Sequence, residues 1–374
     1  MRVLLKGPLN AQSGYGNDTI GIALTFRQAG CRVMLDPVNV QPPIPGEVAE
    51  LLTQRLEPPF DLYLHHVDPA QLGMVEGARR ASTITVAHTM WEMTSLDNLH
   101  GRSKLKKNLK DYDLVVGYDN VTTESLKPYV TTKQATVQGG YWPKPWPQSF
   151  RDWHSPTLNF CMVGALGPRK DPFLAIQAFK ELREEHPDVN ITLNIKTVSP
   201  GLHTKMQDWI PGLRIFYETW PEQVLRDFYA SNHVLIAPSR GEGKNMPALE
   251  MLSTGGTVIA TNWGGHTQWL SSQIGYPLDY RLEPLHSSQP DCQWAKASKS
   301  HLKELMLHAY HHRDELARKG DLAANLIPAM CAWPKVIDRL MDRVGELNEA
   351  GERVLHKYRV AKGRAEEQRQ VMLL

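Results

Sequence analysis

The chain lacks several features that mark particular classes of protein. It has only four cysteines among 374 residues, and the spacing of Cys31, Cys161, Cys292 and Cys331 fits neither a metal site nor a redox motif. No stretch approaches the roughly 18 uninterrupted apolar residues of a membrane span, and the N-terminal apolar run is too short for the core of a signal peptide. We therefore expect a protein of a reducing compartment, located in the cytoplasm, without stable membrane insertion.

A strong net charge and a dinucleotide-binding motif are also missing. The formal net charge is +2, which argues neither for nor against an anionic partner. The glycine-containing loop KGPLNAQSGYG at 6–16 lacks the G-x-G-x-x-G spacing, so a Rossmann dehydrogenase is weakly supported.

What the sequence does contain is a regular alternation of short apolar strands and helical stretches, which is typical of βα units on a parallel sheet. The alternation stops at 139–156, a stretch with four prolines and three tryptophans, and starts again at 158. We therefore predict an α/β fold with two doubly wound, Rossmann-like domains facing across a cleft. The expected boundaries are an N-terminal domain at 1–145, a linker at 146–157, a C-terminal domain at 158–332 and a helical extension at 333–374. In this architecture ligands bind at the carboxyl ends of the strands.

Two glutamates at such a strand end are the first candidates for chemistry. In PSRGEGKNMPALEMLSTGGTVIATNWGG (238–265), Glu242 lies in a glycine-rich turn after a strand, and Glu250 lies on the helix that follows. The N-terminus of that helix favours anions or sugar hydroxyls, because its first amides lack helical partners. The pair can serve acid/base work or bind hydroxyls; otherwise the two are a solvated loop acid and an ordinary helix residue.

At this point the sequence resembles a known family. Glu242 to Glu250 matches the E-x7-E motif of the family-4 glycosyltransferases, which are retaining enzymes of GT-B architecture. The segment VGALGPRKDPFLAIQAFKEL is similar to the donor-phosphate strand, loop and helix of that family, and STGGTVIATNWGGHTQWL is similar to its return strand with a glycine pair. The resemblance is dense from about 158 to 270 and diffuse elsewhere.

The resemblance implies roles for particular residues in the second domain. Arg169 and Lys170 would neutralise the diphosphate of a nucleotide-sugar donor, and a departing nucleoside diphosphate does need cationic stabilisation. Glu250 would accept hydrogen bonds from the donor ribose, and Glu242 would lie near the transferred sugar. The backbone amides of Lys244, Asn245 and Met246 would contact the sugar or phosphate. Many relatives have an aromatic residue or glycine where this chain has Lys244 and Asn245, so the identity of the sugar stays open.

In the N-terminal domain the resemblance implies a donor- and acceptor-binding surface. Gly14 and Gly16 match the positions where the backbone approaches the donor phosphate and the acceptor; a plain βα turn is the alternative. His88 ends a predicted strand and corresponds to a histidine that touches the transferred sugar, unless it is a structural histidine.

Three other clusters have weaker functional interpretations. His65, His66 and Asp68 end another strand, but adjacent residues of a strand point to opposite faces, so packing or acceptor contacts are favoured over a metal site. His308, His311 and His312 share a helical face with zinc-compatible spacing but no nearby carboxylate or cysteine. The basic segment at 101–110 can bind phosphate groups or form a solvated helix face.

The resemblance thus implies a metal-independent, retaining transferase with no cofactor. It would move a hexosyl or pentosyl group from a nucleotide sugar to a hydroxyl of a glycan, a lipid-linked intermediate, a protein or a modified nucleobase such as that of modified DNA. The resemblance implies a front-face mechanism, in which the leaving phosphate assists deprotonation of the acceptor. No residue stands out as a covalent nucleophile, and no D-x-D motif occurs in a suitable context. Two alternatives remain open: a nucleotide-sugar epimerase of the same fold, and a catalytically silent binding protein.

Overall fold

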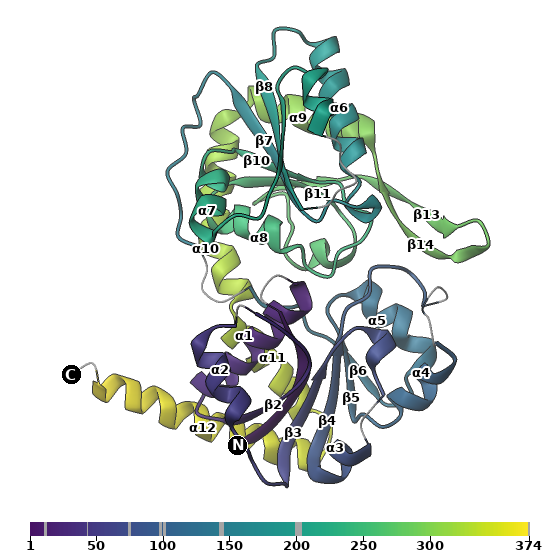
Figure 1. Ribbon diagram of the computed structural model, residues 1–374, viewed down its shortest axis with the longest axis vertical. Coiled ribbons are helices and arrows are strands. Elements are labelled where there is room, and N and C mark those ends of the chain that lie inside the picture. The colour runs from purple at the N-terminus through teal and green to yellow at the C-terminus, as the bar shows by residue number, and fades with distance from the viewer. Residues whose placement is uncertain are drawn as a thin grey trace. The chain divides into compact units, whose positions relative to one another are not determined.

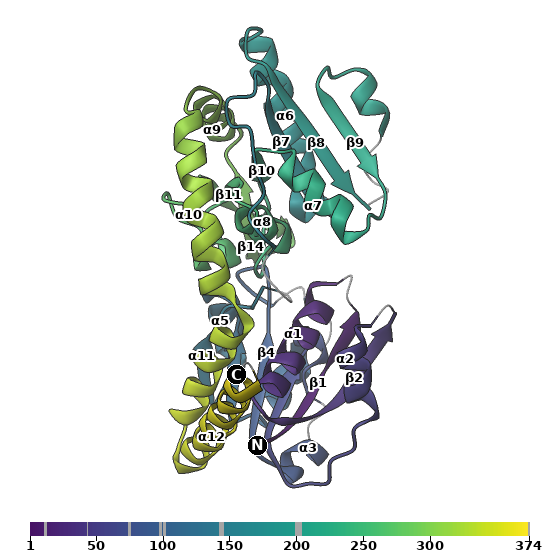
Figure 2. The same ribbon diagram turned by 90° about the vertical axis from the view of Figure 1, so that its left-hand side faces the viewer.

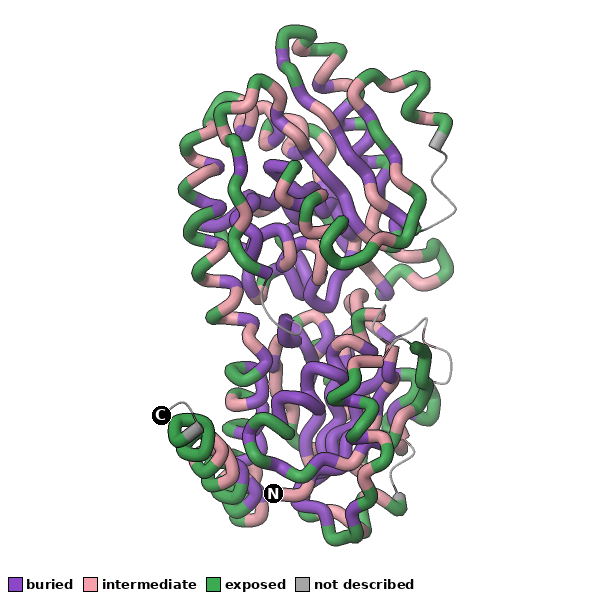
Figure 3. Tube along the Cα trace, turned by 60° about the vertical axis from the view of Figure 1, so that its left-hand side comes forward, coloured by how far each residue is buried: buried purple, intermediate pink, exposed green. Residues whose placement is uncertain are grey.

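The computed structural model describes residues 1–10, 13–42, 44–73, 76–96, 99, 102–141, 146–198 and 204–372. The chain forms two compact units. Unit 1 contains residues 1–144 and 331–374, and unit 2 contains residues 145–330. In both units buried residues follow the strands of a central sheet (Figure 3).

Unit 1 is built on a parallel sheet of six strands in the order β2-β1-β3-β4-β5-β6. The strands are β1 (Arg2–Asn10), β2 (Arg32–Gln41), β3 (Phe60–His66), β4 (Ser82–Thr89), β5 (Leu114–Gly117) and β6 (Lys133–Thr136). The helices are α1 (Gly14–Gln28), α2 (Gly46–Thr53), α3 (Glu76–Ala81), α4 (Arg102–Leu109), α5 (Asn120–Leu126), α11 (Trp333–Gly345) and α12 (Glu349–Met372). The strand order reverses next to β1, so ligands are expected at the carboxyl ends of β1 and β3.

Helices cover both faces of this sheet. Figure 1 shows α1, α2 and α11 on one side and α4 and α5 on the other. The first group and α12 share one hydrophobic cluster with the strands, which includes Phe26 and Trp333. The second group shares another, which includes Leu105 and Leu109 of α4. Both faces are therefore apolar, as parallel sheets require.

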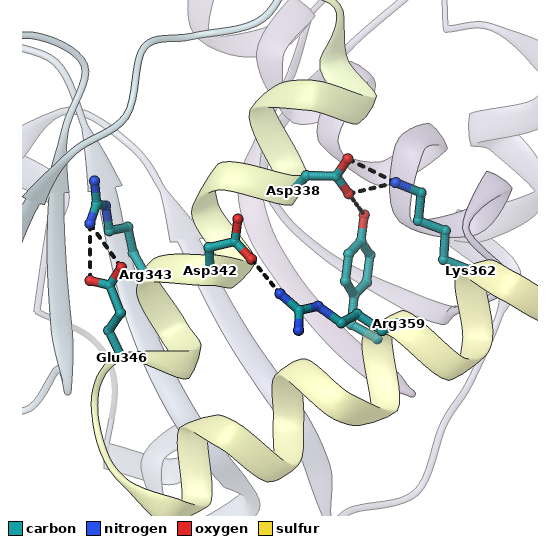
Figure 4. Close-up of polar contacts among 7 residues, drawn as sticks. Asp338, Asp342, Arg343, Glu346, Arg359 and Lys362 are labelled. Carbon is teal, nitrogen blue, oxygen red and sulfur yellow. Dashed lines mark hydrogen bonds and ion pairs between the residues drawn. The ribbon is translucent and has the colours of Figure 1, made fainter.

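Helix α12 is fixed to unit 1 by apolar and polar contacts. The Tyr358 ring packs edge-on against Phe26, and its hydroxyl donates to Asp338 of α11 at 2.9 Å. Asp338 also pairs with Lys362 at 2.7 Å, one turn beyond Tyr358 (Figure 4). The predicted helical region at 333–374 is therefore present as α11 and α12, and these helices pack within unit 1.

Unit 2 has a second parallel sheet in the order β12-β11-β10-β7-β8-β9. Its strands are β7 (Leu158–Gly164), β8 (Ile191–Thr197), β9 (Leu213–Tyr217), β10 (Val234–Ala237), β11 (Thr257–Thr261) and β12 (Tyr276–Leu278). The helices are α6 (Pro172–Glu185), α7 (Glu222–Ala230), α8 (Met246–Ser253), α9 (Lys299–His311) and α10 (Arg313–Cys331), which continues the chain toward α11 (Figure 2). This is the Rossmann strand order, with its reversal between β7 and β10.

An antiparallel hairpin of β13 (Tyr280–His286) and β14 (Gln289–Ala297) projects from the body of unit 2 (Figure 1). The hairpin has no counterpart in the predicted elements.

The predicted two-domain α/β architecture is confirmed by the two six-stranded parallel sheets. Helix α1 begins at Gly14, because the Ser13 hydroxyl caps it by accepting from the Gly16 amide at 3.0 Å. Asp171 directly precedes α6, but its side chain makes no capping hydrogen bond.

Candidate functional site

Three charged residues meet at the carboxyl end of the unit 2 sheet. Strand β7 ends at Gly164, whose φ of 137° is accessible mainly to glycine, and the chain then forms the short helix η3 (Pro168–Lys170). Glu242, in the loop after β10, pairs with Lys170 at 2.6 Å and with Arg169 at 3.1 Å. Two cations against one carboxylate leave this cluster with a net positive charge, which suits a diphosphate.

Glu242 is buried but ionised. Burial raises the pKa of its carboxyl, but the charges of Lys170 and Arg169 together with the Lys170 hydrogen bond outweigh this effect and lower the pKa to about 2. At neutral pH Glu242 therefore holds no proton. It can orient cations and accept hydrogen bonds, but it is unsuited to act as a general acid.

The loop that holds Glu242 is fixed by the segment after β11. The Gly265 amide donates to the Glu242 carbonyl at 2.7 Å, and a Cβ on Gly265 would lie 2.0 Å from the Gly243 carbonyl oxygen. The Trp269 indole donates to the Lys244 carbonyl at 2.9 Å. The glycine pair that the sequence analysis singled out is thus needed for close approach of two loops.

Asn245 adopts the left-handed conformation, with φ 64°, directly before α8. Its side-chain amide donates to His266 Nε2 at 2.9 Å and does not cap the helix. His266 in turn donates through Nδ1 to the Thr261 carbonyl at 2.7 Å, and burial lowers its pKa to about 4. A neutral His266 therefore holds the Asn245 side chain away from the first turn of α8.

Glu250 lies on α8 and accepts a hydrogen bond from the Tyr229 hydroxyl at 2.7 Å. Burial raises the pKa of Glu250 to about 7, although the Tyr229 hydrogen bond and the charges of Lys244 and Lys196 oppose that rise. Lys196 also lies over the ring of Trp220 at 5.9 Å. Glu250 can accept hydrogen bonds from ligand hydroxyls as a carboxylate and donate one when protonated.

In unit 1, His88 is the penultimate residue of β4 and is buried beside other aromatic rings. Its ring centroid lies 4.6 Å from that of Tyr118 and 5.1 Å from that of His66. His66 donates through Nδ1 to the His88 carbonyl at 3.2 Å. The Tyr118 hydroxyl donates to Asp18 at 2.6 Å. We call His66, His88, Tyr118 and Asp18 the unit 1 cluster; sequence reasoning missed the last two.

The two predicted glycines of unit 1 differ in what their positions require. A Cβ on Gly16 would lie 2.1 Å from the Asn10 carbonyl oxygen, so α1 can begin against the end of β1 only with glycine there. A Cβ on Gly14 would meet only the Met90 methyl group, at 3.9 Å. Residues 11–12 of this loop lie outside the described residues.

The remaining candidates are explained by local packing. His65 faces away from His66 and its Nδ1 lies 2.6 Å from the Tyr112 hydroxyl, whereas Asp68 caps a turn by accepting from the Ala70 amide. His308 bonds Glu315 at 2.8 Å and stacks on His312. In the described chain no group of three or more potential ligands is arranged to hold a metal ion.

The basic segment at 101–110 falls mostly on α4. Residue 101 lies outside the described residues. Lys104, Lys106, Lys107 and Lys110 are exposed, and Leu105 and Leu109 anchor the helix in the core. No helix among the described residues is long and apolar enough to cross a membrane.

Comparison with known proteins gives the segment around Glu242 a family context. Residues 157–276 match the family model for Glycosyl transferases group 1. A 106-residue segment is 30% identical to an uncharacterised glycosyltransferase of Sulfolobus islandicus rod-shaped virus 1, covering 28% of this chain and 31% of that protein. The chain spans less than a third of the length of the curated relatives it matches.

Solved structures resemble the fold over nearly the whole chain. A sucrose-phosphate synthase from Thermosynechococcus elongatus aligns with a TM-score of 0.65 and 12% identity, over 93% of this chain and 99% of that one. The Anabaena protein HepE in complex with UDP-glucose aligns with a TM-score of 0.59 and 10% identity, over 92% and 100%. The fold is therefore that of the GT-B glycosyltransferase structures, and residues 157–276 of unit 2 are similar to the glycosyl transferases group 1 family.

Proposed function

We propose that the protein is a retaining, metal-independent glycosyltransferase of family 4, which moves a sugar from a nucleotide-sugar donor to an acceptor hydroxyl. The observation that carries the proposal is the buried Glu242 held between Arg169 and Lys170, inside the segment that matches the group 1 family.

The charges of this cluster suit departure of a nucleoside diphosphate. In the proposed reaction Arg169 and Lys170 bind the diphosphate and stabilise the negative charge that develops as its bond to the sugar breaks. These two cations supply the stabilisation that a divalent metal ion supplies in other transferases. Glu242 keeps both cations in place and lies near the transferred sugar.

The state of Glu242 favours front-face retention over a covalent intermediate. Each of its carboxylate oxygens already faces a cation, and a pKa of about 2 makes it a weak base. We infer that the leaving phosphate takes the proton of the acceptor hydroxyl. His88 of the unit 1 cluster is proposed to contact the transferred sugar.

Glu250 is proposed to bind the donor ribose. Its position on α8 beside Tyr229 and Lys196 offers hydrogen-bonding groups for ribose hydroxyls. The backbone amides of Lys244, Asn245 and Met246, at the N-terminus of α8, are proposed to contact phosphate or sugar. UDP is the first nucleotide to test, because HepE was solved with UDP-glucose.

The acceptor class remains part of the proposal. A glycan or lipid-linked acceptor ranks above a protein or a modified nucleobase, and hexosyl and pentosyl groups are both compatible with the site. Cytoplasmic location belongs to the same proposal and is tested by cell fractionation.

The test is calorimetric titration of the full chain with UDP, GDP and ADP and with the corresponding nucleotide sugars, each with and without EDTA. We expect saturable binding of one nucleotide that survives EDTA. Slow release of free sugar from the bound donor would support a transferase, an isomerised donor would indicate an epimerase, and neither product would indicate a silent binding protein.

Substitution of the two cations is the matched mutational test. Arg169→Ala and Lys170→Ala should each lower turnover more than tenfold, because charge stabilisation at a leaving group contributes on the order of 3 kcal/mol. Lys180→Ala, on the exposed side of α6, is the control. An unchanged rate in the first two variants would remove these cations from the mechanism.

A further inference from the structure

A cavity of about 740 Å³ lies at the base of the β13–β14 hairpin. Its walls come from the first turns of α6, the paired ends of the hairpin strands and the start of α9. None of the residues proposed above to bind the donor lines this cavity. It is thus a separate concave surface within unit 2.

Two aromatic rings are left exposed in this cavity. Phe173, in the first turn of α6, is 49% exposed, and Tyr280, the first residue of β13, is 39% exposed. Both line the cavity. Large aromatic side chains that a fold leaves outside its core, grouped around a hollow, indicate a ligand with apolar surface.

The charges around the cavity are balanced. Arg240 pairs with Asp171 at 2.7 Å, and Lys299 pairs with Glu181. Glu283 pairs with Arg281 at 2.7 Å and with Lys296 at 3.5 Å. The four cations of the lining are Arg240, Arg281, Lys296 and Lys299, and its two carboxylates are Asp171 and Asp279. Glu181 and Glu283, outside the lining, pair with three of these cations. Four carboxylates thus offset four cations around the cavity, which lacks the concentrated positive charge that phosphate or polyanion sites use. It presents donors and acceptors side by side.

Neutral polar groups complete the walls. Gln177 lies one helical turn after Phe173 on α6, and the hydroxyls of Ser298 and Ser300 lie 3.1 Å apart at the start of α9. Hydroxyl and amide groups can donate and accept hydrogen bonds. The lining therefore matches a ligand that combines apolar faces with many hydroxyl groups.

We propose that this cavity binds a neutral oligosaccharide. The rings of Phe173 and Tyr280 would stack on the apolar C–H faces of sugar rings, and the surrounding polar groups would bond the hydroxyls. The Arg240 guanidinium stacks over Trp294 of the hairpin at 5.1 Å, and its amide donates to the Arg169 carbonyl at 2.7 Å. Arg240, which lines the cavity, is therefore in direct contact with Arg169 of the proposed donor site. A role of the cavity as a second binding site for an acceptor chain rests on the proposed function.

The proposal is tested by calorimetry of the full chain without nucleotide. The probes are maltoheptaose, cellohexaose and chitohexaose, with sulfated dextran and polyphosphate as anionic comparisons. We expect saturable binding of at least one neutral oligosaccharide. Phe173→Ala and Tyr280→Ala should each weaken it about two- to tenfold, which is the size of contribution that single aromatic contacts make, and the double variant should weaken it further.

Controls separate this site from folding defects and from the donor site. Phe150→Ala removes another ring, which is 90% exposed and does not line the cavity, and should leave binding unchanged, whereas Tyr280→Trp should retain it. Arg169→Ala should lose nucleotide affinity but keep oligosaccharide affinity. Binding of the anionic probes alone, no saturable binding of any neutral oligosaccharide, or equal affinity in the wild type and the double variant would overturn the proposal.

Discussion

At the scale of single residues, Glu242 shows how one buried charge joins segments that are far apart in the chain. Its carboxylate pairs with Arg169 and Lys170 of η3, and its backbone carbonyl accepts from Gly265. A buried carboxylate of this kind stabilises the fold only while it is ionised and both cations face it. The stability of unit 2 must therefore depend on pH.

The direction of that dependence follows from the pKa of Glu242. The pKa falls from an ordinary 4.5 to about 2 on folding, so the unfolded chain binds a proton more readily. The contribution is fully present above pH 4.5 and is lost as the pH falls toward 2, with a total on the order of 3 kcal/mol. Urea unfolding between pH 2.5 and 6 measures how this contribution to the free energy of unfolding changes with pH. Glu242→Gln should flatten this part of the profile, and Glu184→Gln, at an exposed position, should not; equal slopes in both variants would contradict the assignment.

The hydrogen bond from Tyr118 to Asp18 provides a second prediction at this scale. Both residues are fully buried, and Tyr118→Phe would remove a donor from a carboxylate that water does not reach. The free energy of unfolding should fall by about 1–3 kcal/mol. Tyr217→Phe, at a position 49% exposed, should change it by less than about 0.5 kcal/mol. Chemical denaturation at pH 7 distinguishes the two, and equal stabilities would show that the bond contributes nothing.

The sequence revealed part of the candidate site, for reasons that can be stated residue by residue. Glu242 stood out because it follows a predicted strand in a glycine-rich turn, whereas Arg169 and Lys170 were implied by the resemblance to the family-4 glycosyltransferases. The structure does bring the three together. Their roles remain predictions. Tyr229, His266 and Asp18 were missed because each is a single residue whose partner lies far away in the sequence, so no local spacing marks it.

At the scale of elements, the apolar strands could be predicted from the sequence, whereas the hairpin could not. Strand β7 coincides with the apolar run at 158–164, because both faces of a central parallel strand are buried. Strand β13 (YRLEPLH) is largely exposed on both faces, so its short apolar–polar alternation marks no buried face. Pro284 also argues against a strand at this position.

The start of α1 allows a matched prediction about two glycines. Gly16→Ala should destabilise unit 1 by at least about 2 kcal/mol, since its methyl group would meet the Asn10 backbone. In Gly14→Ala the added methyl group would contact only the terminal methyl group of Met90. This substitution should be neutral or slightly stabilising, because alanine favours the helix. Thermal unfolding of both variants tests this. Similar losses in the two would mean that the approach of α1 to β1 does not require Gly16.

At the scale of the whole molecule, the two units were predicted, but their connectivity was not. Charged residues dominate the sequence after 345, and this hid the apolar positions through which α12 packs on unit 1. Val354 and Tyr358 are almost fully buried, and Lys357 pairs with Asp61 at 2.6 Å. The C-terminal helix is therefore structural.

Removal of α12 tests this role. Truncation after residue 348 should expose the cluster around Phe26 and destabilise unit 1 by on the order of 4 kcal/mol, from the lost burial of two large side chains and their neighbours. Truncation after residue 363, which keeps Tyr358 and Lys362, is the control. Limited proteolysis read by mass spectrometry should show cleavage within residues 1–144 in the first variant and protection of 150–325 in both. Equal protection of unit 1 in both truncations would contradict the assignment.

The return of the chain to unit 1 has a consequence for synthesis. Residues 145–330 are an insertion between the first and last parts of unit 1, so the strands of its sheet are made long before the helices that cover them. At translation rates of about 5–20 residues per second, the nascent sheet waits roughly 10–40 s for α11 and α12. During that interval the apolar surface that these helices will cover is open to chaperones. Synthesis of unit 1 thus starts before that of unit 2 and is completed after it.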